Sequence, residues 1–238
     1  MKPLRFRPHP DIDAEALARQ FAVERRVRIQ PFLTDDDAAA LYAAVRARED
    51  WRQVVNSGDK VFELDRATRA ALLPAQTAAL DEAVRNGARE GFQYRYESLR
   101  LPDGNANDAS AEPLAALTRS LSNGAARDLL RQVTGNAAID FADGQATAYS
   151  PGDFLTGHDD EVPGKSRQAA YVLGLNPVWR IEWGGLLLFH RDRAVTGVSP
   201  GYNSLDVFAV RQLHSVSEVT ASAAYRRYAV TGWLRAAY

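Results

Sequence analysis

The sequence predicts a mainly β fold with supporting α-helices, in which a double-stranded β-helix (a jelly roll) forms the core and N-terminal helices pack on it. Two observations predict this. From residue 137 onward the 238-residue chain is a series of eight short runs of β-type residues, and many short strands in close succession are typical of a jelly roll. Before that point helical patterns dominate. We therefore expect one domain over 1–238, with 1–136 as helical and strand support and 137–238 as the jelly-roll core.

The first 136 residues are expected to alternate helices with a few strands. Acidic residues open the helix over 11–24, Thr34 is placed to cap the next one, and Gly91 ends the third. The segment 102–113, PDGNANDASAEP, is interpreted as a surface connection. The predicted helices are 11–24, 35–50, 74–90, 113–122 and 124–133, and the predicted strands are 26–33 (an edge strand), 51–56 and 92–101.

The eight short strands expected in the core bring distant residues together. A jelly roll places the strand that carries His158 close to the strand that carries His214. The pair Gly184-Gly185 would let the backbone bend at a strand start. The predicted strands are 138–144, 145–152, 154–160, 168–176, 184–190, 203–210, 214–219 and 227–234.

Composition excludes several classes of function. Hydrophobic residues make up 46% of the chain and charged residues 25%, as in ordinary globular proteins, and the net charge of −1 gives no electrostatic reason to expect a nucleic-acid partner or an anionic membrane. The chain has no cysteine, so disulfides and thiolate metal sites are excluded. The start, MKPLRFRPHP, has no apolar signal segment, and no apolar run is long enough to span a membrane. We expect a cytoplasmic protein with no direct nucleic-acid or membrane partner.

His158 and Asp160 form the first half of a candidate metal site. In an extended strand they would share one face, and Asp159 would point the other way. An imidazole and a carboxylate suit Fe(II), Mn(II) or Zn(II), although such a pair alone is more often part of an ordinary surface or turn. His214, in the strand-like stretch FAVRQLHSVSEV, supplies a second imidazole. Two histidines and one carboxylate make the facial triad of non-haem iron oxygenases, which leaves open coordination positions.

Arg227 is a candidate anion-binding residue. Strand alternation puts it on one face with Ala229, Thr231 and Trp233, so the small neighbours leave room for a guest and Trp233 can line the same pocket. A buried guanidinium is costly unless an anion pairs with it, and its fork matches a carboxylate. The alternative is an ion pair with one of the chain's own carboxylates, which the position disfavours.

The motifs HDD, GGLLLF, HSVSEV and RYAVTGWL resemble those of the Fe(II)- and 2-oxoglutarate-dependent dioxygenases of the prolyl 4-hydroxylase-like group. Within that group YSPGDFLTGHDD and HSVSEV are most similar to the catalytic domain of the ribosomal prolyl hydroxylases. The resemblance covers 137–234, and RVRIQPFL at 26–33 is similar to how members of the group begin. It implies Fe(II), 2-oxoglutarate and O2 as cofactor and cosubstrates, and it allows ascorbate as a further cofactor.

Carried over by motif, the resemblance implies that His158, Asp160 and His214 bind iron and that Arg227 holds the distal carboxylate of 2-oxoglutarate; these four would be the catalytic residues. Tyr149 matches a tyrosine that the ribosomal hydroxylases use toward the cosubstrate, and a core aromatic is the equal alternative. A loop such as 102–113 can overhang the active site in this family.

The sequence also departs from the family. A second cosubstrate tyrosine is expected near Gly174, but Tyr171 is three residues away and on the other face, so it is not included. Eukaryotic ribosomal hydroxylases carry a second, non-catalytic barrel, whereas this chain ends at Tyr238, which weakens the case for a ribosomal protein as substrate. His190 is expected at a strand end and His9 in a tail, neither with a metal role.

The leading hypothesis from the resemblance is a dioxygenase that hydroxylates an unactivated C–H bond, of a prolyl residue in a protein or peptide, with release of succinate and CO2. A carboxylate at Asp160 argues against a halogenase, which needs that coordination position for halide. Three alternatives stay open: hydroxylation of a free amino acid or other small molecule, a non-catalytic module that senses 2-oxoglutarate or iron, and a zinc-bound or metal-free structural jelly roll.

Overall fold

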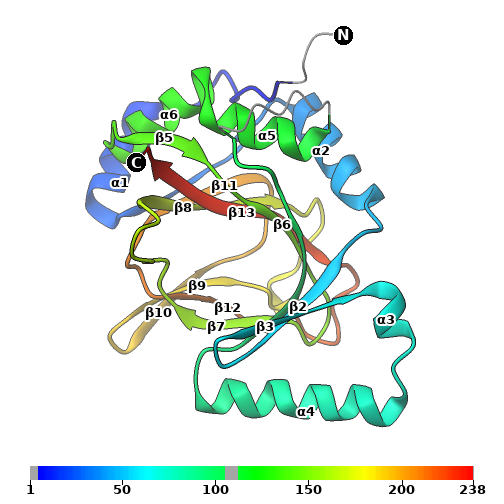
Figure 1. Ribbon diagram of the computed structural model, residues 1–238. Helices are drawn as coiled ribbons and strands as arrows, with labels where there is room; N and C mark the ends of the chain where they lie inside the picture. The colour runs from blue at the N-terminus through cyan, green and yellow to red at the C-terminus, as the bar shows by residue number, and fades with distance from the viewer. Residues whose placement is uncertain (1–4, 105–111, 238) are drawn as a thin grey trace.

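The computed structural model describes residues 5–104 and 112–237 as a curled antiparallel sheet with helices on its outside (Figure 1). The order of hydrogen-bonded strands is β1-β11-β8-β13-β6-β4-β7-β12-β9-β10, with β2, β3 and β5 joined at the sides. The elements are α1 Ala14–Glu24, β1 Arg26–Ile29, α2 Asp35–Ala47, β2 Arg52–Ser57, β3 Lys60–Asp65, α3 Arg66–Ala70, α4 Pro74–Glu90, β4 Tyr94–Arg100, α5 Pro113–Ser122, α6 Gly124–Thr134, β5 Ile139–Ala142, β6 Gln145–Tyr149, β7 Phe154–His158, β8 Arg167–Leu175, η1 Ile181–Trp183, β9 Leu187–Arg191, β10 Ala194–Val198, β11 Tyr202–Ala209, β12 His214–Val216 and β13 Arg227–Ala236. The predicted jelly-roll class is confirmed.

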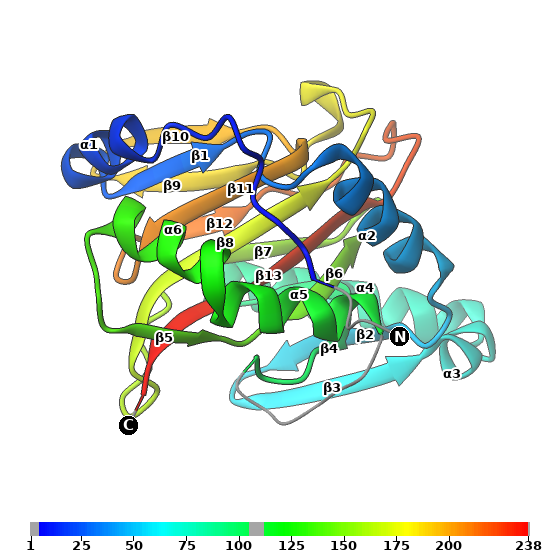
Figure 2. The same ribbon diagram turned by 90° about the horizontal axis from the view of Figure 1, so that it is seen from above.

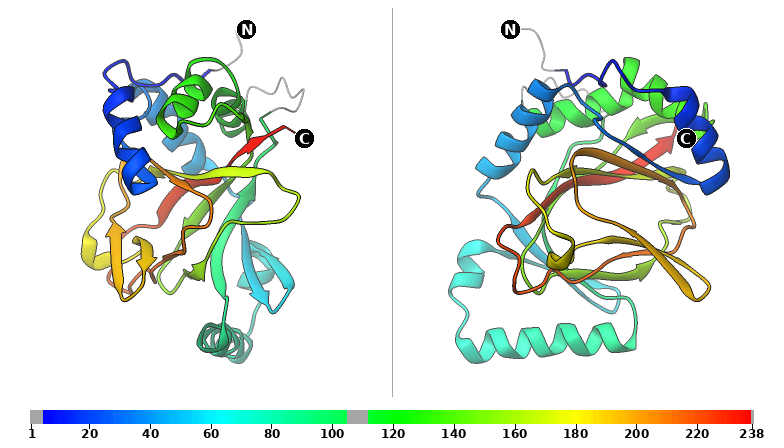
Figure 3. Two further views of the ribbon diagram at one scale, coloured as in Figure 1. Left: turned by 90° about the vertical axis from the view of Figure 1, so that its left-hand side faces the viewer. Right: turned by 180° about the vertical axis from the view of Figure 1, so that it is seen from behind.

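The sheet curls so that it forms two facing layers. One layer contains β1, β11, β8, β13 and β6, and the other contains β7, β12, β9 and β10 (Figure 3). Strand β4 links the layers because it pairs with both β6 and β7. The curl therefore brings β7 and β12 opposite β8 and β13.

Helices α1, α2, α5 and α6 cover the outer face of the first layer (Figures 1 and 2). Alternation along the strands decides which side chains they meet: on β8, Tyr171 and Leu173 join the helix-side core, whereas Ala170 and Val172 face the space between the layers. The main core is built from fully buried aliphatic side chains of both the helices and the strands, among them Leu41, Leu117, Leu130, Leu205 and Val230. This packing holds one wall of the inter-layer space rigid.

Most predicted elements are present, although the ends of several are shifted and the short 3-10 helix η1 was not predicted. Strand β7 ends at His158 rather than at Asp160. Strand β3, the short helix α3 and the edge strand β10 were not predicted. The predicted connection over 102–113 lies largely outside the described residues, because 105–111 are not described. The edge position of β1 is confirmed, since it pairs with β11 alone.

Two helix starts of similar sequence differ in their capping. Asp13 caps α1 through a carboxylate oxygen that accepts from the N–H of Ala16 at 2.9 Å. Thr34 stands at the predicted N-cap of α2, but it makes no side-chain cap bond, and its buried hydroxyl has no hydrogen-bond partner among the described residues. The position of the second cap was therefore predicted correctly and its mechanism was wrong.

This contrast gives a stability prediction. Asp13→Ala should lower the free energy of unfolding by about 1 kcal/mol, because the N–H of Ala16 loses its acceptor. Thr34→Ala should change it by less than about 0.5 kcal/mol, since no hydrogen bond is lost. Urea denaturation of the two variants beside the wild type measures both effects, and equal losses would contradict the capping assignment.

Candidate active site

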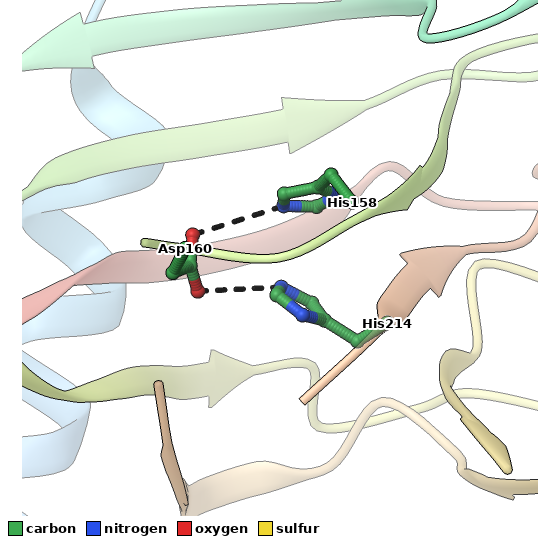
Figure 4. A group of neighbouring side chains, drawn as sticks. All are labelled: His158, Asp160 and His214. Atoms are coloured by element: carbon green, nitrogen blue, oxygen red, sulfur yellow. Dashed lines mark ion pairs between the residues drawn. The ribbon is translucent and has the colours of Figure 1, made fainter. Parts of the chain in front are cut away.

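His158, Asp160 and His214 meet between the two layers of the sheet (Figure 4). These three residues are called the metal group below. His158 is the last residue of β7, Asp160 lies in the chain just beyond it, and His214 opens β12 directly opposite His158 in the strand register. The Asp160 oxygens lie 3.8 Å from Nε2 of His158 and 3.4 Å from Nε2 of His214. One potential ligand atom from each residue lies within 4.8 Å of the other two, so the three could hold a single ion.

Both imidazoles are oriented for metal binding by backbone carbonyls. Nδ1 of His158 lies 3.1 Å from the carbonyl oxygen of Thr156, and Nδ1 of His214 lies 2.8 Å from that of Gln212. A carbonyl only accepts, so each Nδ1 carries the proton and each Nε2 presents a lone pair toward Asp160. Burial lowers the pKa of His214 and the nearby His158 lowers it further, while Asp160 raises it. Together these effects favour the neutral form of His214, which is the form that binds metal.

The three side chains lie in a cavity of about 670 Å³ between the layers. This volume is in the usual range for small-molecule sites. Strand β13 contributes the far wall through Arg227, Thr231 and Trp233, as strand alternation predicted. The cavity mouth carries three apolar side chains that are nearly half exposed, namely Phe92 (49%), Leu213 (47%) and Val162 (42%).

Arg227 is the one buried guanidinium in the wall of this cavity for which the described residues supply neither a hydrogen bond nor an ion pair. Arg227 is 3% exposed, and its Nε has no hydrogen-bond partner among the described residues. Asp206 is held by Arg28 instead, through bonds of 2.7 and 2.8 Å. Burial lowers the pKa of Arg227, whereas Tyr149 and Asp206 raise it. A buried cation without a partner is costly, so this part of the cavity suits an anionic guest.

Gly185 makes room for the Arg227 side chain. The φ angles of Gly184 and Gly185 are +67° and +63°, in the left-handed region that favours glycine. A Cβ at Gly185 would lie 2.9 Å from Cδ of Arg227. The predicted bend at this glycine pair is therefore present, and it also lets β13 begin with a long side chain directed inward.

Tyr149 lies beside Arg227 and has features both of a core aromatic and of a cosubstrate-binding residue. It is 3% exposed and stacks on Tyr96 with ring centroids 4.9 Å apart, as a core aromatic would. It also lines the cavity, and its ring centroid lies 5.1 Å from Cζ of Arg227. Burial raises the pKa of Tyr149 well above its ordinary value, so the hydroxyl stays protonated and can donate.

Comparison with known proteins agrees with this geometry. Residues 144–235 match the family model of the 2OG-Fe(II) oxygenase superfamily, a range that contains His158, Asp160, His214, Arg227 and Tyr149. The name of the superfamily implies Fe(II) and 2-oxoglutarate, and both the His-Asp-His group and the unpaired Arg227 fit them.

Two curated relatives that match part of the chain are prolyl 3-hydroxylases. The chain is 32% identical over 122 residues to prolyl 3-hydroxylase sudestada1 of Drosophila melanogaster. This alignment covers 45% of the chain and 22% of that protein. It is 33% identical over 131 residues to prolyl 3-hydroxylase OGFOD1 of Mus musculus, in an alignment that covers 51% of the chain and 24% of that protein. The chain thus spans about a quarter of the length of each relative.

A solved structure shares the fold. The prolyl hydroxylase of Trichoplax adhaerens, solved with a peptide fragment of the hypoxia inducible factor oxygen degradation domain, superposes with a TM-score of 0.61 at 16% identity. The match covers 94% of this chain and 89% of that one. At this identity it establishes the architecture alone. Within the described residues, the chain has no helix that is both long and apolar enough to cross a membrane.

Arg167 also lines the cavity, and sequence reasoning missed it. Its Cζ lies 3.4 Å from the ring centroid of Trp233, and Nη1 donates to the carbonyl of Asp160 at 3.0 Å. Nε of Arg167 and Nε1 of Trp233 are buried without hydrogen-bond partners among the described residues. Arg167 and Trp233 line the same cavity as His158, Asp160 and His214, so the two donors can meet an acceptor on a guest there. Strand alternation would have placed Arg167 with Ala169, but the register with β13 is irregular between Leu234 and Arg235, near Arg167.

Three other residues considered in the sequence analysis, Tyr171, His190 and His9, make their own contacts in the structure. Tyr171 donates from its hydroxyl to the carbonyl of Asp143 at 2.9 Å and packs in the helix-side core, and it also reaches the lining of the cavity. Nε2 of His190, near the end of β9, lies 2.8 Å from the hydroxyl of Ser215, away from the metal group. His9 accepts at Nδ1 from the N–H of Asp11 in the N-terminal segment.

Asp153 makes the stability of the protein depend on pH. It lies in the turn between β6 and β7, where it accepts from the N–H of Ser150 at 2.8 Å and pairs with Arg95 at 3.0 Å. Burial raises the pKa of Asp153 to about 6. Ser150 and Arg95 each lower this pKa, but the effect of burial is larger. A carboxyl with a raised folded-state pKa adds stability below its unfolded pKa and loses it as pH rises through about 6.

Asp153→Asn should therefore flatten the pH profile of stability. Between pH 4.5 and 7, Asp153 should lower the wild-type free energy of unfolding by about 2 kcal/mol, and this component should be missing in the variant. Chemical denaturation over that range measures the difference between variant and wild type. Asp140→Asn, at a carboxylate 45% exposed, is the control and should keep the wild-type profile. Parallel profiles for Asp153→Asn and wild type would contradict the raised pKa.

Proposed function

We propose that the chain is an Fe(II)- and 2-oxoglutarate-dependent dioxygenase that hydroxylates an unactivated C–H bond, with 137–238 as the catalytic core and 1–136 as its support. The observation that carries the proposal is the pairing of two features in one cavity. A His-Asp-His group suited to Fe(II) lies on one side, and an unpaired buried guanidinium lies on the other. Neither feature alone requires a cosubstrate, but together they fit a ligand that chelates a metal at one end and ends in a carboxylate.

His158, Asp160 and His214 would hold Fe(II) from one side and leave its other positions open. Fe(II) with 2-oxoglutarate and O2 supplies the oxidising chemistry, in which 2-oxoglutarate becomes succinate and CO2. Arg227 would bind the distal carboxylate of the cosubstrate through its fork, and Tyr149 would donate a hydrogen bond to the cosubstrate from its neutral hydroxyl. Trp233, Phe208 and the aliphatic wall exclude water from the cavity.

The prime substrate is proposed to be a prolyl residue of a protein or peptide. The curated relatives are prolyl 3-hydroxylases, and a protein of the same fold has been solved with a peptide. The exposed apolar rim of Phe92, Val162 and Leu213 favours a substrate larger than a free amino acid, since such a rim would have no contact with one. A ribosomal protein is the finer proposal, supported by the resemblance of YSPGDFLTGHDD and HSVSEV alone.

Succinate formation tests this proposal. The purified chain, with Fe(II), ascorbate and 2-oxoglutarate, is incubated with proline-containing peptides and separately with free proline. We expect succinate release that depends on Fe(II) and peptide, together with a gain of one oxygen on a prolyl residue by mass spectrometry. Oxygen gained only on free proline would favour the small-molecule alternative. Binding of 2-oxoglutarate without turnover on any peptide would favour a sensing module.

Substrates in the cell can be found by comparing the proteomes of cells with and without the gene. Loss of proline oxidation at a defined site in the deleted strain, restored by the wild type and not by a His158→Ala variant, would identify the protein substrate. A ribosomal protein among the affected sites would support the finer proposal. No change in proline oxidation in any protein would count against a prolyl protein substrate.

A further inference from the structure

A second hollow, of about 500 Å³, lies on the far side of β4 from the metal group. Alternation along β4 sends Tyr96 into the active-site cavity and the next side chain, Glu97, into this hollow. Its walls come from β2, β4, α3, α4, the turn over 150–153 and Arg226, the residue before β13. Figure 1 shows α4 below the strands β2 and β3 and α3 beside them.

Guanidinium groups outnumber carboxylates in this hollow. Four arginines line it together with three acidic residues: Arg66, Arg69, Arg95 and Arg226 with Asp81, Glu97 and Asp153. Each nitrogen of the Arg95 guanidinium already has an acceptor outside Glu97, because Arg95 pairs with Asp81 and Asp153 and also donates to the carbonyl of Gly152 at 2.8 Å. The other three arginines share Glu97, which is 1% exposed.

One carboxylate does not need three guanidinium groups. Arg69 donates to one oxygen of Glu97 at 2.8 Å, and Arg226 donates to the other at 2.6 Å. These two bonds already give each oxygen a charged donor. Arg66 approaches the same carboxylate only at 3.4 and 3.5 Å, which is long for a hydrogen bond. The need to neutralise Glu97 therefore does not account for the third positive charge.

The three arginines keep free donors on the open side of the hollow. Their side chains are about one third exposed (39%, 31% and 34% for Arg66, Arg69 and Arg226), and their remaining N–H groups have no hydrogen bond to a described residue. Gln53, only 6% exposed, also lines the hollow, and its side-chain amide makes no hydrogen bond to a described residue. The Gln53 amide therefore opens into the hollow, where it can hydrogen-bond to a ligand or to solvent.

We propose that this hollow binds a small anion of the phosphate or carboxylate type. Guanidinium forks match the oxygens of both groups, and Arg66 with Arg69 on one side and Arg226 on the other can grip such an anion together. The bound anion joins α3 to the start of β13, next to Arg227, and to the turn that leads from Tyr149 to His158. The site is separate from the metal group, and its occupant takes no part in the oxygenase chemistry.

Calorimetric titration of the metal-free chain with pyrophosphate, and separately with citrate, tests the proposal. We expect one molecule bound per chain for at least one of them, and the stronger of the two tells phosphate from carboxylate recognition. Arg66→Gln and Arg69→Gln should each weaken binding about tenfold, which corresponds to the loss of one charge-assisted contact. Arg19→Gln removes the same charge from the distant helix α1, at a side chain 71% exposed, and should leave the affinity unchanged.

Two more variants distinguish an anion site in this hollow from a structural charge cluster and from binding in the active-site cavity. Glu97→Gln removes the competing carboxylate and should tighten binding, whereas a purely structural role for the cluster predicts lower stability without any change in affinity. Arg227→Ala should leave the binding of the probe intact. Binding that is lost in Arg227→Ala and kept in Arg66→Gln and Arg69→Gln would assign the anion to the active-site cavity and overturn the proposal. Absence of binding by the wild type for both probes would overturn it as well.

Discussion

His158→Ala and His214→Ala should each abolish turnover and lower the affinity for Fe(II) by more than about a hundredfold. Loss of a group that only orients a metal ligand typically costs ten- to a hundredfold, so loss of a ligand itself should cost more. Each substitution would leave one imidazole and the Asp160 carboxylate, too few ligands to fix the ion on one side. Binding of Fe(II), or of Mn(II) as a redox-stable substitute, is measured by calorimetry under anaerobic conditions.

His190→Ala is the matched control for both variants. It removes an imidazole of the same chemistry from the neighbouring strand β9, where Nε2 lies beside the hydroxyl of Ser215 rather than the metal group. Metal affinity in this variant should stay within about twofold of the wild type, since no ligand is removed. Equal loss of metal in all three variants would indicate a general effect on folding, and retained turnover in His158→Ala would contradict the ligand assignment.

The metal group could be predicted from sequence because the prediction depends on only two properties of its residues. These are the chemistry of the side chains and the pairing of the strands that carry them. One step of the sequence prediction was wrong. Strand alternation was expected to bring His158 and Asp160 to one face, but β7 ends at His158 and Asp160 lies beyond it. The carboxylate reaches the site through the bend of the chain after the strand, and Arg167 helps to hold that bend by donating to the carbonyl of Asp160.

The elements that sequence reasoning missed lack the signal that it uses. Strand β3, KVFELD, is almost wholly exposed, so its residues have no buried face to produce a clear alternation. Helix α3 has five residues, too few for a helical period. The cluster around Glu97 was missed for another reason: its arginines come from α3, β4 and the residue before β13, and their convergence depends on how the sheet curls.

Arg227→Met should have opposite effects on ligand affinity and on stability. Removing one partner of a buried charge pair costs 2–5 kcal/mol, so the affinity for 2-oxoglutarate should fall by about thirtyfold or more. In the absence of cosubstrate the same change removes a cation that is 3% exposed and has an unsatisfied Nε. Methionine fills similar space without a charge, so the ligand-free protein should be as stable as the wild type or about 1–3 kcal/mol more stable.

These opposite signs distinguish a ligand-binding arginine from a structural one. An arginine that holds the fold through a partner in the chain would destabilise the protein when replaced, and the affinity for 2-oxoglutarate would change only as the folded fraction changes. Chemical denaturation without cosubstrate gives the first quantity and calorimetric titration of the metal-loaded chain gives the second. Arg28→Met is the matched control, because Arg28 is bound to Asp206 through two short bonds. It should lower stability, since it leaves a buried carboxylate without a partner, and an Arg227→Met variant that behaves in the same way would remove Arg227 from the cosubstrate role.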